Sequence, residues 1–173
     1  MKLKKIFSFT LIEMMVVIGL IALFAGLFVA NYHIGGRISD LLTQTEKIAG
    51  VLKEAQIMSL TGKSVSGIRP DRGYGVYIEN SHSYKLFADT SSDSTYSYDS
   101  NDKVIQSFTT PSAIEINSST KNFVFAPPKG TVYFDGSLGA ETKTITIWQK
   151  AINRYLYIKI DPSTGRIDIV SSL

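Results

Sequence analysis

The feature that most constrains this chain is an uncharged apolar run near its N-terminus. Every residue from Met14 to Ala30 is apolar or glycine. As an α-helix, segment 9–30 would be about 33 Å long at 1.5 Å per residue, enough to cross a bilayer core of about 30 Å. Lys2, Lys4 and Lys5 precede it, and basic residues stay on the cytoplasmic side. We therefore expect a single-pass helix over 9–30 in the cytoplasmic membrane, with its N-terminus in the cytoplasm.

Composition excludes several classes of function. The 173 residues carry 18 Lys and Arg against 15 Asp and Glu, a net charge of +3. Segment 1–8 holds three of the lysines, so the rest of the chain has 15 basic and 15 acidic residues and no net charge. A strongly basic, nucleic-acid-binding domain is therefore not expected. The chain has no cysteine, which excludes disulfides, thiolate metal ligands and a cysteine nucleophile.

A helical period continues beyond the apolar run. Gly62 is a natural terminator and the first proline is Pro70, so one helix of about 50 residues is expected, with Gly35 and Gly36 as its weakest point. Between Arg37 and Leu60, apolar residues recur at intervals of three and four, as on one helical face: Ile38, Leu41, Leu42, Ile48, Ala49, Leu52 and Ala55.

From residue 73 onward the hydrophobic period changes to two. Short segments rich in β-branched and aromatic residues alternate with turn residues, and no helical segment intervenes, so a mainly antiparallel sheet is expected. A long helix whose apolar face covers such a sheet is an α+β fold. The predicted strands are 74–79, 84–88, 103–108, 113–117, 122–126, 131–135, 142–148, 154–160 and 165–170.

These patterns divide the chain into four expected parts. Segment 1–8 is a basic leader, 9–30 is a transmembrane helix, 31–62 is an amphipathic extension of that helix, and 63–173 is an extracytoplasmic β-rich domain. Two simple interpretations of the N-terminus remain open: a signal anchor, or a signal peptide cut after Ala30. Neither explains Glu13 at the start of the run, because a carboxylate at the bilayer centre costs about 2.5 to 3.5 kcal/mol.

The stretch "SFTLIEMMVVIGLIALFAGL" resembles the N-terminus of type IV pilins and of the pseudopilins of type II secretion systems. In that family a basic leader ends in a small residue, usually glycine, followed by phenylalanine and "TLIE". The resemblance implies cleavage by a prepilin peptidase between Ser8 and Phe9 and N-methylation of Phe9. Ser8 stands where the family usually has glycine. It also implies a pilin-like fold, in which the first half of the helix forms a filament core and the second half packs on the sheet.

The resemblance gives Glu13 a role in assembly. Cleavage before Phe9 creates an α-amine that is largely cationic at neutral pH, since its unperturbed pKa is about 7.7 to 8.0. By analogy with the family, Glu13 of one subunit meets this amine on its neighbour, and a paired buried charge is tolerated where a lone one is not. The implied partners are the prepilin peptidase and methylase, other pilin or pseudopilin subunits, and the cytoplasmic membrane.

Later segments are similar to the minor pseudopilin type found at the tip of the type II pseudopilus, and to related minor pilins. They are "KEAQIMSLTGKSV", "YGVYIE", "FAPPKGTVYFDG" and "GRIDI". The resemblance therefore implies a non-enzymatic structural subunit of a type IV pilus or a type II pseudopilus, with a minor role. The alternative is a minor pilin of a competence or adhesion pilus that binds DNA or another ligand.

Three groups of residues bear on binding or catalysis. The polar segment 89–102 is expected to be an exposed, solvated loop, and calcium binding through Asp89, Asp93, Asp99 and Asp102, with Asn101 beside them, is the alternative. His33 and His82 are far apart in sequence and suggest no metal site or catalytic base. A basic and aromatic set would serve the DNA-binding alternative if the strands placed it on one face: Lys143, Lys150, Arg154, Lys159 and Arg166 with Trp148, Tyr155 and Tyr157.

Overall fold

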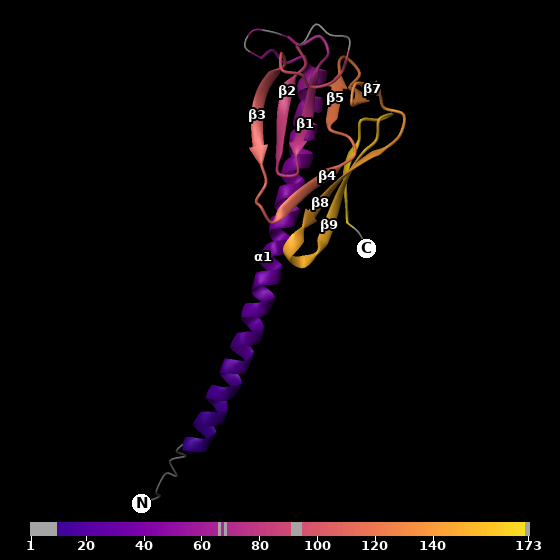
Figure 1. Cartoon of the computed structure of the whole chain (residues 1–173). Coiled ribbons are helices and arrows are strands. Elements are labelled where there is room, and N and C mark those ends of the chain that lie inside the picture. The colour runs from indigo at the N-terminus through magenta and orange to yellow at the C-terminus, as the bar shows by residue number, and fades with distance from the viewer. Residues whose placement is uncertain (1–9, 66, 68, 91–94, 172–173) are drawn as a thin grey trace, which may run out of the picture. The chain divides into compact units, whose positions relative to one another are not determined.

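The computed structural model describes residues 10–65, 67, 69–90 and 95–171, without the side chains of 29–33 (Figure 1). The chain divides into two compact units, 1–37 and 38–173. Helix α1 spans Leu11–Thr61 and so contributes to both units. The unit boundary falls next to Gly35 and Gly36, where the sequence predicts the helix to be weakest.

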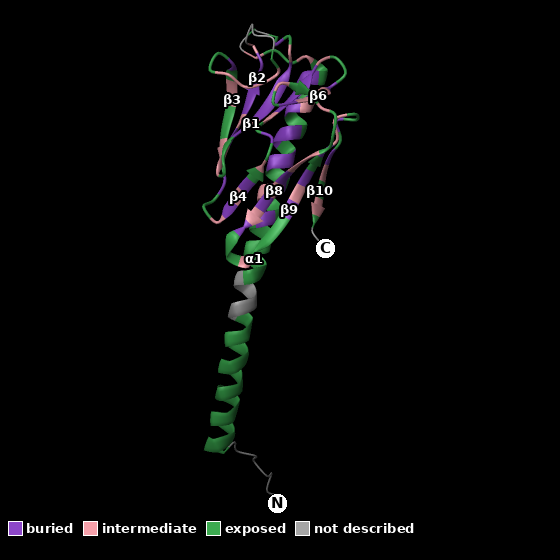
Figure 2. Ribbon diagram, turned by 45° about the vertical axis from the view of Figure 1, so that its right-hand side comes forward, coloured by how far each residue is buried: buried purple, intermediate pink, exposed green. Residues whose placement is uncertain are grey.

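In the first unit, the described side chains from Leu11 to Phe28 are all exposed (green in Figure 2). This window of 18 residues has a mean hydropathy of 2.5, so it is long and apolar enough to cross a membrane, and a signal sequence would meet the same criterion. An exposed apolar surface of this size is typical of segments that contact a membrane or other apolar surfaces.

The C-terminal end of α1 is closed by the predicted glycine. Gly62 adopts a positive φ of 60° and its N–H donates to Ser59 O at 3.2 Å, while Lys63 N–H donates to Met58 O at 3.1 Å. These two bonds form a Schellman motif, in which glycine takes the left-handed position at no steric cost. The Arg69 guanidinium fills the space that a Cβ at residue 62 would need.

The second unit contains two antiparallel sheets, whereas the sequence suggested one. The six-stranded sheet has the order β3-β2-β1-β5-β6-β7, and the four-stranded sheet has the order β10-β9-β8-β4. The α+β class is confirmed, and each predicted strand corresponds to an observed one. The strands are β1 Tyr74–Asn80, β2 Ser83–Ala88, β3 Lys103–Thr109, β4 Ile114–Ser118, β5 Asn122–Ala126, β6 Thr131–Phe134, β7 Ser137–Leu138, β8 Lys143–Gln149, β9 Arg154–Ile160 and β10 Ile167–Ser171.

The chain first passes from the first sheet to the second between β3 and β4, returns to the first sheet for β5 to β7, and crosses again before β8. The β1–β2 turn supports the first crossing, because Thr110 N–H donates to His82 O and Ile116 N–H donates to Ser81 O, both at 2.8 Å. Two short elements were not predicted: β7 and the 3₁₀-helix η1 Lys150–Ile152. Both are too short to show a hydrophobic period.

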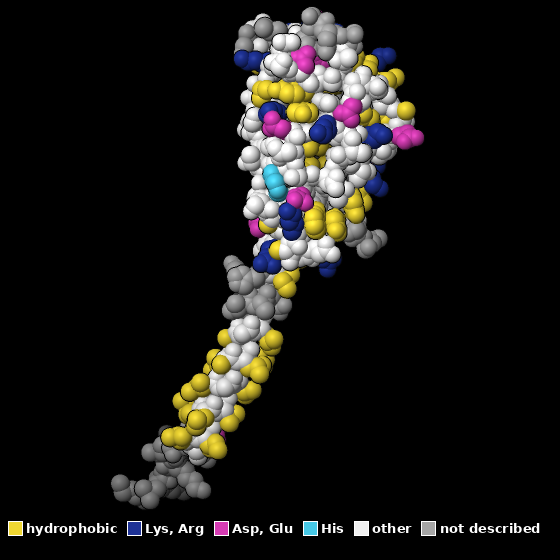
Figure 3. Space-filling view, viewed as in Figure 1, with side chains coloured by type: hydrophobic (Ala, Val, Ile, Leu, Met, Phe, Trp, Pro, Cys, Tyr) yellow, Lys and Arg dark blue, Asp and Glu magenta, His cyan; other side chains and the backbone are white. Residues whose placement is uncertain are grey.

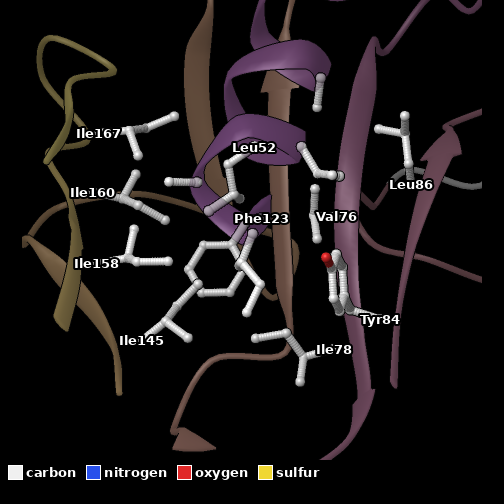
Figure 4. Close-up of a cluster of buried hydrophobic side chains, with 14 of the residues drawn as sticks. Leu52, Val76, Ile78, Tyr84, Leu86, Phe123, Ile145, Ile158, Ile160 and Ile167 are labelled. Carbon is white, nitrogen blue, oxygen red and sulfur yellow. The ribbon is translucent and has the colours of Figure 1, made fainter. Parts of the chain in front are cut away.

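One face of α1 forms the inner layer against which both sheets pack (Figure 4). Leu52 is fully buried, with Ile160 and Ile167 of the second sheet on one side and Val76 of the first sheet on the other. The predicted apolar face is wrong at two positions: Ile38 is 40% exposed and Leu42 is 44% exposed. Ile38 precedes the first buried position of α1, Leu41, and Leu42 lies about 100° around the helix from Leu41.

Candidate functional site

The candidate assembly residue Glu13 takes part in a helix cap. Thr10 N–H donates to Glu13 Oε2 at 2.9 Å, and the Thr10 hydroxyl donates to the same oxygen at 2.8 Å. In return, Glu13 N–H donates to Thr10 Oγ1 at 3.3 Å. This is the reciprocal capping box of the pattern T-x-x-E, which satisfies amide groups that the first helical turn leaves without partners. The pattern was readable in "TLIE" but was not used in the sequence interpretation.

The cap occupies only part of the Glu13 carboxylate. Both bonds from Thr10 end on Oε2, and Oε1 accepts none from the residues that the structure describes. The side chain is exposed at the positive end of the helix dipole, where a carboxylate is stabilised. Glu13 can therefore cap its own helix and still present an oxygen to a cation. Ser8 and Phe9, the predicted processing residues, lie outside the described residues.

The acidic segment 89–102 differs from its prediction. The structure buries Asp89 and Asp102, and Asp102 is only 7% exposed. Asp102 accepts the Thr90 and Asp99 N–H groups, each at 2.9 Å, through its two different oxygens. Asp99 in turn accepts Asn101 N–H at 2.5 Å. The carboxylates of Asp99 and Asp102 thus bind backbone amides and shape the segment from within.

Two tyrosines attach this segment to the first sheet. The Tyr96 ring stacks on Tyr133 of β6 with centroids 3.8 Å apart, and the Tyr98 ring stacks on Tyr77 of β1 at 4.7 Å. Tyr98 also meets Phe87 edge-on at 5.2 Å. The expectation of an exposed loop is confirmed for Thr95, Ser100 and Asn101, but it is wrong for Asp89 and Asp102, which are buried. The described residues between them are half-buried, because alternate aromatic residues hold the segment against the sheet.

The calcium hypothesis finds no assembled site in the described residues. Asp93 lies outside them, and in the remainder no three His, Asp or Glu side chains are grouped so that they could hold a metal ion. The predicted ligands Asp99 and Asp102 already accept backbone hydrogen bonds from their own segment.

Both ring nitrogens of His82 lie near groups of the β4 strand. Its Nδ1 lies 3.0 Å from Ile114 O, and its Nε2 lies 3.9 Å from Glu115 Oε1. Glu115 forms an ion pair with Lys150 at 2.5 Å. His82 thus sits where the chain crosses between the sheets. The side chain of His33 lies outside the described residues.

The basic and aromatic set does not form one basic face. In the register of β8 and β9, Trp148 lies opposite Tyr155 and Thr144 lies opposite Lys159, on the outer face of the second sheet. Lys143 and Arg154 have the opposite parity along their strands, that of the buried isoleucines. Two of the other cations are paired with acids, Lys150 with Glu115 and Arg166 with Asp168 at 2.7 Å. A continuous phosphate-binding stripe does not result.

The tip of the β8–β9 hairpin instead carries an ordered aromatic pair. The rings of Trp148 and Tyr155 are nearly parallel, at 6°, with centroids 5.9 Å apart. Asn153 Oδ1 accepts hydrogen bonds from Trp148 Nε1 at 3.2 Å and from the Tyr155 hydroxyl at 3.1 Å. Asn153 has a φ of 49°, a left-handed conformation that Asn tolerates better than most residues. The sequence interpretation had identified both rings but not Asn153.

Beside this tip lies an apolar groove of about 290 Å³. Its wall on α1 is formed by Ile38, Leu41 and Leu42, and its opposite wall by Arg154, Tyr155, Leu156 and Ser171. Because all seven residues belong to the second unit, the groove is a property of that unit alone.

Comparison with known proteins finds no match to this chain among family models, curated proteins or solved structures. The N-terminal pattern and the geometry described above therefore remain the basis for assigning a function.

Proposed function

We propose that this chain is a non-enzymatic structural subunit of the pilin type. In this proposal a prepilin peptidase cuts between Ser8 and Phe9, the new N-terminus is methylated, and the membrane-anchored subunit is assembled into a filament. The filament is a type IV pilus or a type II secretion pseudopilus, and the chain is a minor subunit of it. The globular part lies outside the cytoplasm and its fold is pilin-like.

The observation that carries the proposal is the placement of Glu13. It is the one carboxylate at the start of an exposed apolar helix surface, and one of its oxygens has no bond from the described residues. An apolar surface over Leu11–Phe28 is stable either in lipid or among other apolar helices. The same segment can therefore lie in the membrane before assembly and in the filament core afterwards. Glu13 supplies the charge that can distinguish the two.

The chemistry of assembly follows from electrostatics in a low-dielectric medium. The Phe9 amine exists only after cleavage, and it is mostly cationic at neutral pH. A carboxylate paired with this amine of a neighbouring subunit avoids the cost of a lone buried charge. The cap from Thr10 keeps the Glu13 side chain at the helix start, near the new N-terminus.

The α+β architecture also supports the proposal. The second part of α1 presents its buried face to antiparallel sheets, while the first part is apolar on all sides. A filament built on such subunits has apolar helices at its centre and sheet domains outside.

Two measurements on the protein in its native membrane test the proposal. The intact mass should lack residues 1 to 8 and gain one methyl group, and an unshortened chain would count against processing. Separately, Glu13→Ala should be cleaved and inserted into the membrane normally but should not enter filaments. Glu13→Asp keeps the charge and should still be incorporated into filaments in part. Normal incorporation of Glu13→Ala would refute the assembly role.

A further inference from the structure

The end of the second unit that lies beside the first residues of its helix combines three kinds of side chain. Trp148 and Tyr155 form the ordered aromatic pair, and Ile38 and Leu42 are exposed apolar residues. Arg154, at the first position of β9, lines the same groove as Tyr155, Ile38 and Leu42 although its strand parity differs from that of the rings, and Lys150 pairs with Glu115, the β4 partner of Trp148. We define the tip surface by these residues: Ile38, Leu42, Trp148, Lys150, Arg154 and Tyr155. Figure 3 shows hydrophobic side chains next to basic ones at this end of the unit.

We propose that the tip surface docks on the headgroup layer of an anionic phospholipid bilayer while the chain is anchored by its apolar helix. This inference rests on the membrane anchoring in the proposed function, and it adds a second, lateral contact with the same membrane. The partner is the bilayer surface itself.

The chemistry of the tip surface matches that of a membrane interface. Trp and Tyr are enriched at the headgroup level because each has an apolar ring and a polar group. Asn153 holds both rings in place, with hydrogen bonds of 3.2 and 3.1 Å, so little side-chain conformational freedom remains to be lost on docking. Lys and Arg near the rings can keep their charges among phosphates while their stems lie along apolar groups.

The charges favour an anionic surface. The charge of Lys150 is balanced by Glu115, with which it forms an ion pair at 2.5 Å. Arg154 is exposed and has no ion pair among the described residues. On α1 the neighbouring charges, Arg37 and Asp40, cancel. A basic residue near an anionic leaflet is attracted within roughly a Debye length, about 8 to 10 Å.

Chain length brings the tip surface within reach of the membrane. Ile38 follows Phe28, the last residue of the apolar window, by ten positions. Ten residues span about 15 Å as a helix and at most about 36 Å when extended. This limit holds whatever the arrangement of the two units. By contrast, the other end of the helix segment, at Leu60, lies against Gly130 and carries no such aromatic pair among its described neighbours.

A second copy of the chain is a poorer occupant for this surface. A symmetric contact would bring the Lys150 and Arg154 side chains of both copies into one interface, and gathering like charges there is unfavourable. The apolar groove beside the tip is also small, with a volume of about 290 Å³. A stable interface between copies would have to extend well beyond this groove to bury enough surface area.

The chain has one tryptophan, so Trp148 fluorescence reports on the tip surface directly. The full chain is reconstituted at one copy per nanodisc, in phosphatidylcholine alone or with phosphatidylglycerol, and both sets carry lipids with a nitroxide on the headgroup. We expect strong quenching of Trp148 in the anionic discs, weaker quenching in the neutral discs, and loss of the difference at high salt.

The test variant is the double substitution Lys150→Gln and Arg154→Gln. Each cation strengthens association with an anionic surface by about a factor of five. The ratio of docked to undocked protein should therefore decrease by a factor of about 5 to 25 in this variant. The smaller decrease applies if Glu115 already neutralises Lys150. The matched control is Lys63→Gln with Lys129→Gln, which removes the same charge from exposed residues near the end of α1. Unchanged thermal unfolding shows that both variants fold.

Three outcomes would overturn the inference. They are no quenching in anionic discs, equal loss of quenching in the test and control variants, and quenching that appears only when several copies share a disc, which would indicate contact between chains. The discs contain no assembly machinery, so these results leave the filament proposal intact. A chain that fails to enter the discs at all would instead refute membrane anchoring.

Discussion

Thr10 and Glu13 cap the same helix end from both directions, with the Thr10 N–H donating to the carboxylate at 2.9 Å and the Glu13 N–H donating back at 3.3 Å. The residue proposed to bind a neighbour is therefore also bound within its own chain. The carboxylate is held at the helix start, and its second oxygen accepts no hydrogen bond from the residues that the structure describes.

This double role separates two substitutions. Thr10→Ala removes the hydroxyl and should weaken the first turn by about 0.5 to 2 kcal/mol, seen as faster amide exchange near Glu13 in micelles. It keeps the carboxylate, so filament incorporation should persist, unlike in Glu13→Ala. Thr10→Ser, which retains the cap, is the control. Loss of incorporation in Thr10→Ala at normal processing would show that the cap itself is required.

A buried hydroxyl predicts a stabilising substitution. Tyr84 is 1% exposed, stacks on Phe108 at 4.9 Å, and its hydroxyl has no hydrogen-bond partner in the described part of the chain. An unsatisfied buried group costs about 1 to 3 kcal/mol, so Tyr84→Phe should stabilise the protein by about 1 kcal/mol and raise the unfolding midpoint by about 2 to 4 °C. Denaturation in detergent, followed by fluorescence, measures this.

The matched control for that experiment is Tyr74→Phe. Tyr74 is equally buried, but its hydroxyl donates to Lys63 O. Its removal leaves an acceptor without its donor and should destabilise the protein by about 1 kcal/mol. If both tyrosines responded alike, the difference in hydrogen bonding would have no energetic consequence.

The same burial predicts alkaline sensitivity. Burial raises the pKa of Tyr84 to about 12, above its usual value of 10.0. The folded state therefore holds this proton more tightly than the unfolded state. The free energy of unfolding should be independent of this group below pH 10 and should fall as the pH rises toward 12. Unfolding measured between these pH values should show the decline, and Tyr84→Phe should reduce it. An equal decline in the variant would assign it to other groups.

The attachment of segment 89–102 can be tested at its aromatic contacts. Tyr98→Ala removes the contacts with Tyr77 and Phe87, each worth about 0.5 to 1.5 kcal/mol beyond simple burial. We expect faster amide exchange at Thr90 and Asp99, whose N–H groups are bound by Asp102. Tyr98→Phe keeps the ring and should behave as wild type. Unchanged exchange in Tyr98→Ala would mean that Asp102 alone holds the segment.

The central position of Leu52 predicts a large and shared effect. Leu52→Ala opens a cavity between α1 and both sheets and should cost about 2 to 5 kcal/mol. Hydrogen exchange should accelerate in both sheets together, because one helix face supports both. Leu42→Ala, at a residue that is 44% exposed, should cost much less. Protection lost in one sheet alone would contradict a common core.

Local patterns predicted much of this fold. The change of period near residue 73 located the strands, and Gly62 located the helix end, because both signals are carried by neighbouring residues. The division into two sheets was not predictable in this way. It depends on where β4 pairs, with β8 and not with its sequence neighbour β3, and such pairing is decided by contacts distant in sequence.

In the candidate sites too, local features could be predicted from the sequence, whereas contacts between residues distant in sequence could not. Glu13 stood out because a carboxylate is unusual in an apolar run, and its cap was readable in the sequence. The packing of Tyr96 was not, because it requires Tyr133, which lies far along the chain. Likewise, Asn153 gains its meaning only when the hairpin places Trp148 and Tyr155 beside it.

The position of Ile167 in the core has a consequence for the order of events during synthesis. It comes from β10, yet it packs beside Leu52 of α1, more than a hundred residues earlier in the chain. The first sheet can cover its side of α1 as soon as β1 to β6 have emerged, whereas the side that faces Ile167 stays uncovered until β10 is made. Closure of the core on this side is therefore a late event, and a chain interrupted before residue 167 is left with apolar helix surface exposed there.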